Sequence, residues 1–292
     1  MASPTTPQHG RHGAIYRLRP NGFIGSGIND VTWGTAFSGA DSSFFEVEID
    51  AEAIPDTFRW RQDGGAYTDT VAITGAAQAL ADGQTVTFAA TTGHTLLDEW
   101  TVSNLKAEPC TEAGATAQIT DATKRILNPN HKPVFTDDGG EHVLSINYTT
   151  GMAYFSNNVG TVTVEGNLGA IEASGLEKVG YLTNWSFNVS LDLADASYMG
   201  QAWKNNVPGQ AGATGSAETL FIGSDSFLDG ITTKELFFLQ LFNYDPDQDQ
   251  TGDHFNAWVW FNGLSVNAPV GDVVKEGIDF TMDGMPSFTA NV

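Results

Sequence analysis

The sequence predicts an all-β fold: a β-sandwich or barrel core with about one short helix, together with a small β-sandwich module. Three observations lead to this class. Short runs rich in Val, Thr and aromatic residues recur along the chain, with turn sequences between them. Glycine is abundant at 32 residues, whereas stretches with helical periodicity are scarce and weak. Apolar residues make up 41% of the chain, which is enough for a packed core.

Residues 1–40 are expected to form an N-terminal arm and the first strands of the core. "AIYRLRP" alternates in polarity, and "GFIGSGIND" is rich in turn residues. The first twenty residues contain Arg11, Arg17 and Arg19 and no acidic residue, whereas residues 177–292 contain fifteen acidic residues and four lysines. A basic arm on an acidic body predicts head-to-tail contact between copies.

Residues 41–106 are expected to form the small antiparallel sandwich. "SFFEVEID", "TFRWR", "TVAIT", "TVTFAA" and "EWTVSNL" have the length and composition of short strands, and "DGGAY" and "ADGQ" are turn signals between them. Trp60, Tyr67 and Trp100 raise the alternative of a sugar-binding face. Because Trp60 and Trp100 lie in alternating strands, we expect them in the core instead.

Residues 107–292 are expected to form the main β core, after a linker or loop at "KAEPCTEAGATAQITDATK". "INYTTGMAYF" predicts a hairpin that turns at Gly151. "NWSFNVSLDL" predicts a strand with Trp185 and Phe187 on its apolar face and Ser186 on its polar face. The helix is expected at "DSFLDGITTKE", capped by Asp225, and "DASYMGQAWKN" is a weaker second candidate.

Charge and composition exclude several function classes. The formal net charge of −22 opposes binding to nucleic acid or an anionic membrane. Cys110 is the single cysteine, so neither an intrachain disulfide nor a thiolate zinc site is expected. The first residues lack the apolar segment of a secretory signal, and no apolar run is long enough to span a bilayer. No catalytic motif is present, so we expect neither an enzyme nor a cofactor.

The acidic segment "YDPDQDQTGDHF" is a candidate calcium loop. Its carboxylates are Asp245, Asp247, Asp249 and Asp253. An EF-hand loop that began at Asp245 would need Gly at its sixth position and Glu at its twelfth, but the chain has Gln250 and Asn256 there. A polar loop between two strands is therefore the favoured interpretation, no metal site is expected, and weak irregular calcium binding stays an alternative.

Several stretches resemble the major tail tube proteins of siphophages. They are "LTNWSFNVSLDLADASYMGQAWKNNVPGQAGATGSAETLF", "DSFLDGITTKELFFLQLF" and "GDHFNAWVWFNGLSVNAPVGDVVKEGIDFTMDGMPSF", and the likeness runs from about residue 123 to the C-terminus. Residues 41–105 are similar to the small immunoglobulin-like or decoration modules of phage structural proteins. The inserted module is the main departure from the plain family pattern.

This resemblance implies a structural virion protein that self-assembles in the host cytoplasm. Its subunits would form stacked hexameric rings, a tail tube through which phage DNA passes without specific binding, and other tail proteins such as the tape measure and terminator would be partners. Lumen-facing candidates are Asp192, Glu218, Asp279 and Asp283, whereas the four aspartates of the acidic loop are inter-subunit candidates. The alternatives are a carbohydrate-binding or adhesin β protein, a capsid decoration protein and a tail terminator.

Overall fold

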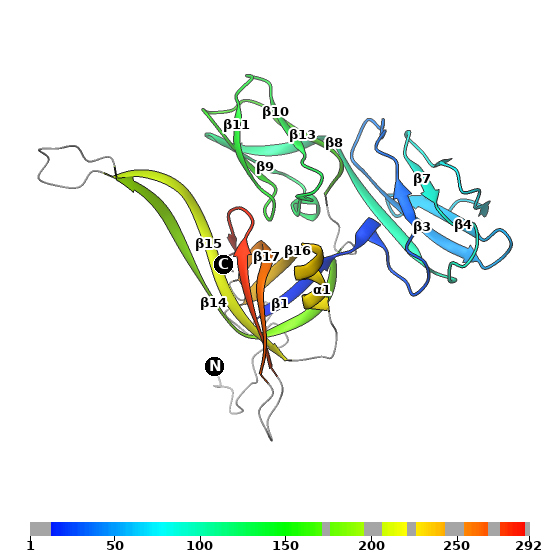
Figure 1. Cartoon of the computed structure of the whole chain (residues 1–292). Coiled ribbons are helices and arrows are strands. Elements are labelled where there is room, and N and C mark those ends of the chain that lie inside the picture. The colour runs from blue at the N-terminus through cyan, green and yellow to red at the C-terminus, as the bar shows by residue number, and fades with distance from the viewer. Residues whose placement is uncertain are drawn as a thin grey trace, which may run out of the picture. The chain divides into compact units, whose positions relative to one another are not determined.

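The computed structural model describes residues 13–170, 176–195, 206–220, 226–242, 254–267 and 275–289. This part of the chain confirms the all-β prediction, because its regular structure is antiparallel strands with one α-helix and two short 3-10 turns (Figure 1). The chain divides into two compact units, which we describe separately: unit 1 comprises residues 1–17 and 178–292, and unit 2 comprises residues 18–177. None of the described helices is long and apolar enough to cross a membrane.

Unit 1 is built on a sheet that closes on itself. Its members are β1 (Gly13–Leu18), β14 (Leu176–Asp195), β15 (Asn206–Leu220), β16 (Leu236–Phe242), β17 (His254–Asn267) and β18 (Lys275–Met282). The strand order is β16-β1-β14-β15-β18-β17, and β17 pairs with β16 to complete the ring. A short strand, β19 (Ser287–Thr289), pairs with the start of β17.

The alternating polarity of these strands fills the closed sheet with apolar side chains. Its core contains Ile15, Leu182, Phe237, Leu239, Leu241, Val259, Phe261, Ile278 and Phe280. The predicted helix is confirmed as α1 (Ser226–Thr233), whose Ile231 packs against this core. Gly230 approaches the ring of Phe237 so closely that an added Cβ would lie 2.4 Å from it, so the helix needs glycine there. The second helix candidate falls mainly on residues 196–205, outside the described residues.

Unit 2 contains two apolar clusters that share one long strand. Its strands are β2 (Val31–Trp33), β3 (Ser43–Ala51), β4 (Thr57–Gln62), β5 (Val71–Ala72), β6 (Gln78–Ala79), β7 (Thr85–Phe88), β8 (Glu99–Ala113), β9 (Thr116–Ile119), β10 (Val134–Asp137), β11 (Val143–Asn147), β12 (Met152–Phe155) and β13 (Val162–Ala170). Its 3-10 turns are η1 (Pro20–Gly22) and η2 (Ala122–Lys124). The first cluster holds Trp100 and Val102 of β8, and the second holds Leu105 and Cys110 of the same strand.

The prediction of a linker or loop at residues 106–124 was wrong. β8 continues through it to Ala113, and β9 returns against β8. The segment carries small and polar residues, but Cys110, Ala117 and Ile119 alternate into the second apolar cluster. The hairpin predicted around Gly151 is confirmed as β11–β12, and this glycine has φ of 62°. The expected domain boundaries at 40/41 and 106/107 fall inside unit 2, and the roles assigned to those parts stay predictions.

Candidate functional site

The candidate site is the outer face of unit 1 over β14, β15, β18 and β17, which we call the polar face. Register places side chains of one kind in rows across these strands: Ser186 of β14 lies opposite Ser216 of β15, which lies opposite Asp279 of β18. The next row joins Asn188, Thr214 and Thr281 in the same way. Hydroxyl, amide and carboxylate groups therefore cover one side of a sheet whose other side is the apolar core.

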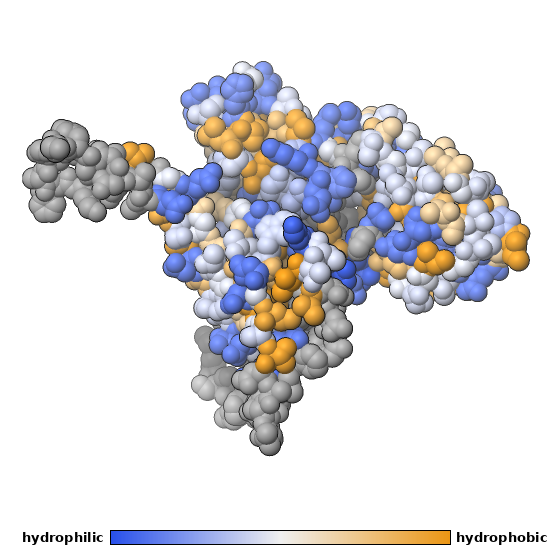
Figure 2. Space-filling view, in the orientation of Figure 1, coloured by the Kyte–Doolittle hydropathy of each residue, from blue (hydrophilic) through white to orange (hydrophobic). Residues whose placement is uncertain are grey.

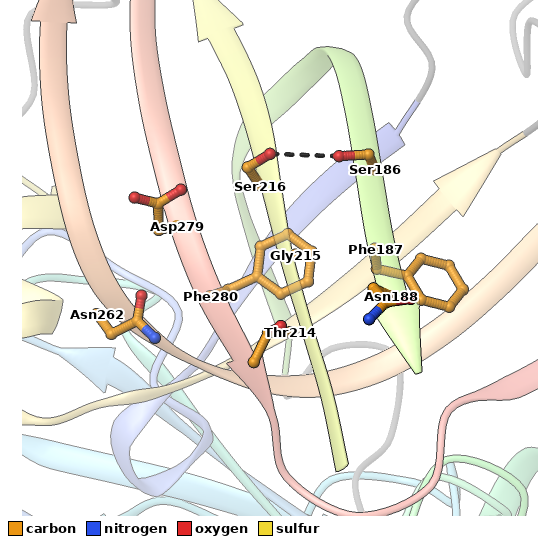
Figure 3. A pocket seen from close by; sticks show the side chains of 9 residues that line it. All are labelled: Ser186, Phe187, Asn188, Thr214, Gly215, Ser216, Asn262, Asp279 and Phe280. Atoms are coloured by element: carbon orange, nitrogen blue, oxygen red, sulfur yellow. Dashed lines mark hydrogen bonds between the residues drawn. The ribbon is translucent and has the colours of Figure 1, made fainter. Parts of the chain in front are cut away.

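A shallow, open hollow of about 580 Å³ lies on the polar face (Figure 3). Its lining consists of Ser186, Phe187, Asn188, Thr214, Gly215, Ser216, Asn262, Asp279 and Phe280. The Ser186 and Ser216 hydroxyls lie 3.3 Å apart and form a hydrogen bond across the two strands (Figure 3). The hollow offers neutral polar groups and one carboxylate, so it lacks the paired acid and base that hydrolysis of a glycoside needs.

Glycine at position 215 shapes the floor of this hollow. A Cβ at Gly215 would lie 2.5 Å from Cζ of Phe280 and 2.5 Å from the carbonyl oxygen of Ser186. Figure 3 shows the Phe280 ring passing beside Gly215 at the centre of the labelled residues. Only a residue without a side chain lets the aromatic ring and the β14 backbone approach β15 so closely.

The far part of the β14–β15 hairpin extends beyond the rest of the closed sheet (Figure 1). β18 pairs with β15 only from Thr214 to Leu220. On the other side of the hairpin, β14 is the neighbour of β1, and Gly13 at the described start of β1 lies against Leu182 of β14. The two strands are antiparallel, so β1 runs from this point toward residue 178 of β14. Within the described chain, residues 206–213 of β15 thus pair with β14 alone, and their other edge is open.

This far part of the hairpin exposes apolar side chains. Val189, Leu191 and Val207 are 57%, 50% and 52% exposed. Apolar surface is visible close to the end of the hairpin (Figure 2). Val189 and Leu191 continue the alternation of Trp185 and Phe187, which are half-buried against the core. The alternation predicted for this strand is confirmed as far as Leu191, but no apolar cluster of the described residues lies beneath its far part.

The structure brings some of the predicted acidic residues together and separates others. Glu218 and Asp279 lie on neighbouring strands of the polar face, because Ser216 is opposite Asp279 and Glu218 is opposite Gly277. Asp192 is exposed on the far part of β14, and Asp283 is exposed just beyond the end of β18. Sequence reasoning missed the hydroxyl and amide residues between them, although the alternation of "NWSFNVS" placed Ser186 on this face.

The other predicted site residues lie elsewhere. Arg17 belongs to β1 and forms an ion pair of 2.7 Å with Glu235, and Arg19 donates a hydrogen bond to the carbonyl oxygen of Phe23. Arg11 and the four aspartates of the acidic loop lie outside the described residues. In the part of the chain that is described, no three His, Cys, Asp or Glu side chains are grouped so as to hold a metal ion.

The sugar-binding alternative loses its aromatic platform in unit 2. Trp100 is fully buried, and Trp60 is half-buried against the same apolar cluster, which confirms the core interpretation. The ring of Tyr67 is covered by the guanidinium groups of Arg59 and Arg61, whose Cζ atoms lie 4.3 and 4.7 Å from its centroid. The two tryptophans are thus part of the core, and arginine side chains lie over the Tyr67 ring.

Comparison with known proteins gives a limited result. No protein-family model and no curated protein matches the chain. Among solved structures, it is similar to a chain from the C6-symmetric tail of an empty gene transfer agent particle, with 14% identity and a TM-score of 0.32 over 40% of this chain and 89% of that one. A chain from the virion of a native gene transfer agent particle gives 16% identity and a TM-score of 0.31 over 39% and 89%. Similarity this low carries no argument about function.

Proposed function

We propose that the protein is a structural, non-enzymatic subunit of a phage tail tube, which self-assembles into stacked hexameric rings around a DNA-wide channel. The observation that carries the proposal is the far part of the β14–β15 hairpin, whose β15 edge is open within the described residues and which has one aliphatic face and one polar face. The sequence resemblance to tail tube proteins over residues 123–292 supports the same conclusion.

The open edge of β15 favours assembly by strand pairing. Unpaired backbone N–H and C=O groups along an extended strand are a template for pairing with another chain. Monomeric proteins usually protect such edges with charge or proline, and the described β15 edge, residues 206–213, carries Pro208 but no charged residue. A second copy that pairs here would extend the sheet from subunit to subunit.

The two faces of the hairpin then acquire different environments. Exposed Val189, Leu191 and Val207 would be covered by the neighbouring subunit, and burial of an aliphatic side chain contributes about 1.5–3 kcal/mol. Asn188, Ser190 and Asp192 would face the lumen together with Glu218, Asp279 and Asp283. A wall of hydroxyl, amide and carboxylate groups favours passage of DNA, because each lysine or arginine on a phosphate adds binding free energy.

The remaining contacts of the subunit follow from this assembly. The basic N-terminal segment with Arg11 and the acidic loop with Asp245, Asp247, Asp249 and Asp253 would contribute to contacts between subunits or rings. The tape measure and terminator would bind the lumen and the end of the tube. The protein would therefore belong to the virion tail after assembly in the host cytoplasm.

Electron microscopy of hairpin variants tests the proposal. The wild-type protein should form rings or tubes with an open lumen when negatively stained over a range of protein and salt concentrations. Leu191→Asp should abolish them, because it places a charge on the face that a neighbour covers. Leu144→Asp is the matched control, since Leu144 is 69% exposed in β11 of unit 2, and this variant should assemble normally.

Each outcome of this experiment decides something. Stacked rings lost only in Leu191→Asp support the tube. Single closed rings that never stack favour a terminator or decoration protein. Normal assembly of Leu191→Asp would remove the hairpin face from the interface, and a wild-type protein that stays monomeric under every condition, even with purified tail-tip components, would overturn the proposal.

A further inference from the structure

The polar face contains a lysine that lies close to one of its carboxylates. Lys275 begins β18 opposite Leu220, and Glu218 lies diagonally across from it on β15, opposite Gly277. The Lys275 Nζ atom is 3.7 Å from Oε2 of Glu218. Alternation places Lys275 on the same side of β18 as Gly277 and Asp279, which is the polar face.

Lys275 is the one cation that the described strands β15, β17 and β18 carry on this face. The other basic groups described in unit 1 are engaged or remote from it. Arg17 is paired with Glu235, Lys178 lies 3.7 Å from the ring centroid of Tyr181, and Lys234 follows α1. A DNA phosphate that met this part of the face would therefore find Lys275 as its cationic partner.

The ion pair contributes little to the stability of the fold. Both side chains are 47% exposed, and 3.7 Å is too long for a hydrogen bond. Exposed pairs of this kind contribute little to stability, and salt screens them further. Its effect on local charge is larger, because a carboxylate within 4 Å offsets the attraction of the ammonium group for a phosphate.

We propose that Glu218 shields Lys275 from DNA: it is a positioning residue that keeps the one lysine of the described strands β15, β17 and β18 on this face from holding a phosphate. This inference rests on the proposed function, because it assigns DNA as the molecule that meets the polar face. It gives Glu218 a role different from that of Asp279, which lies four residues along β18 from Lys275, about 13 Å in an extended strand, and repels DNA without masking a cation.

A double-mutant cycle on DNA binding tests the shielding. Full-length wild type, Glu218→Gln, Lys275→Gln and the double variant are titrated into a short fluorescein-labelled DNA duplex at low ionic strength, with fluorescence anisotropy as the readout. Glu218→Gln should bind more tightly, and Lys275→Gln in the same chain should remove the gain. The slope of log K against log salt should steepen by about 0.9 in Glu218→Gln alone, so its advantage over wild type shrinks roughly 3.5-fold for each fourfold rise in salt.

Asp279→Asn is the matched control, since it removes the same charge from the same face. Its effect on affinity should be equal with Lys275 present or replaced, because sites this far apart act independently. Equal melting temperatures of all variants would show that the fold is intact. The proposal is overturned if Glu218→Gln binds DNA no more tightly than wild type, or if its gain persists without Lys275. Failure of ring assembly would overturn the tube but leave this cycle unaffected, so the two failures are distinguishable.

Discussion

At the scale of single residues, the chemistry of this protein is set by burial that the sequence does not reveal. His94 is completely buried in unit 2, where Nδ1 lies 3.0 Å from Asp56 and Nε2 lies 3.0 Å from Asp30. These residues are 38 and 64 positions away in the chain, so no local pattern could pair them. In the sequence, His94 lies in the polar segment "TTGHTLLD" between two strands. In the structure it joins three loops at one end of the first apolar cluster.

The thiol of Cys110 provides a pH-dependent prediction. Its pKa is raised to about 12, chiefly by burial and in addition by the nearby carboxylates of Glu112 and Glu108. A thiolate is the reactive form, and a free cysteine has a pKa of about 8.5, so the folded protein should resist thiol reagents at pH 9. Labelling with a chromogenic disulfide should be slow in buffer and rapid in denaturant. Prompt stoichiometric labelling of the folded chain would contradict the burial.

The same shift fixes the sign of a stability change. Between about pH 9 and pH 12 the thiol ionises in the unfolded chain but keeps its proton in the folded one. The contribution of Cys110 to the free energy of unfolding is therefore complete below pH 9 and is lost as pH rises toward 12. Cys110→Ser removes this pH dependence, which chemical unfolding at several alkaline pH values measures.

At the scale of elements, alternating polarity along the sequence predicted where strands lie, whereas the pairing of strands in the sheet determines which of their edges and faces are exposed. "NWSFNVSLDL" predicted β14 and its two faces, and "DSFLDGITTKE" predicted α1. The sequence could not show that β15 extends beyond its partner β18, which pairs with it only from Thr214 to Leu220, because this pairing is tertiary. The same limit explains the error at residues 106–124, where small side chains concealed strands that pairing extends.

The glycines of β15 allow a matched prediction about sheet packing. Gly215→Ala places its Cβ 2.5 Å from the Phe280 ring and from the Ser186 carbonyl oxygen, so the ring or the strand must move. We expect a loss of about 1–3 kcal/mol in the free energy of unfolding, as for other overpacked cores. Gly212→Ala is the control, because no atom lies within 4 Å of its added Cβ. Urea unfolding should separate the two, and equal stabilities would refute the close packing at Gly215.

At the scale of the whole molecule, charge and topology act together. The chain has a formal net charge of −22, so copies repel one another at low ionic strength, and contact between them is favoured where aliphatic surface is exposed. The uneven charge distribution predicts contact between copies, and the net charge opposes nucleic-acid binding. Only the fold shows which surface could make this contact, namely the far part of the β14–β15 hairpin, which continues from the closed sheet.

Topology also explains how the chain accommodates unit 2. The chain passes from unit 1 into unit 2 after Arg17 in β1 and returns to unit 1 at Lys178 in β14. These two strands are antiparallel neighbours in the closed sheet. Unit 2 is thus inserted where a simple hairpin loop would otherwise connect them. Both units have apolar clusters of their own, which is the condition for folding independently.

We therefore expect unit 2 to be removable. A chain in which Asn-Gly replaces residues 18–177 should form a β1–β14 hairpin, because a two-residue turn of this type suits antiparallel neighbours. It should give a cooperative melting transition and a β-type circular dichroism spectrum, and on the proposed function it should still form rings. The isolated segment 18–177 is the complementary control and should fold without assembling. Aggregation of the shortened chain, with a folded isolated segment, would show that unit 1 depends on unit 2 and that the insertion is not modular.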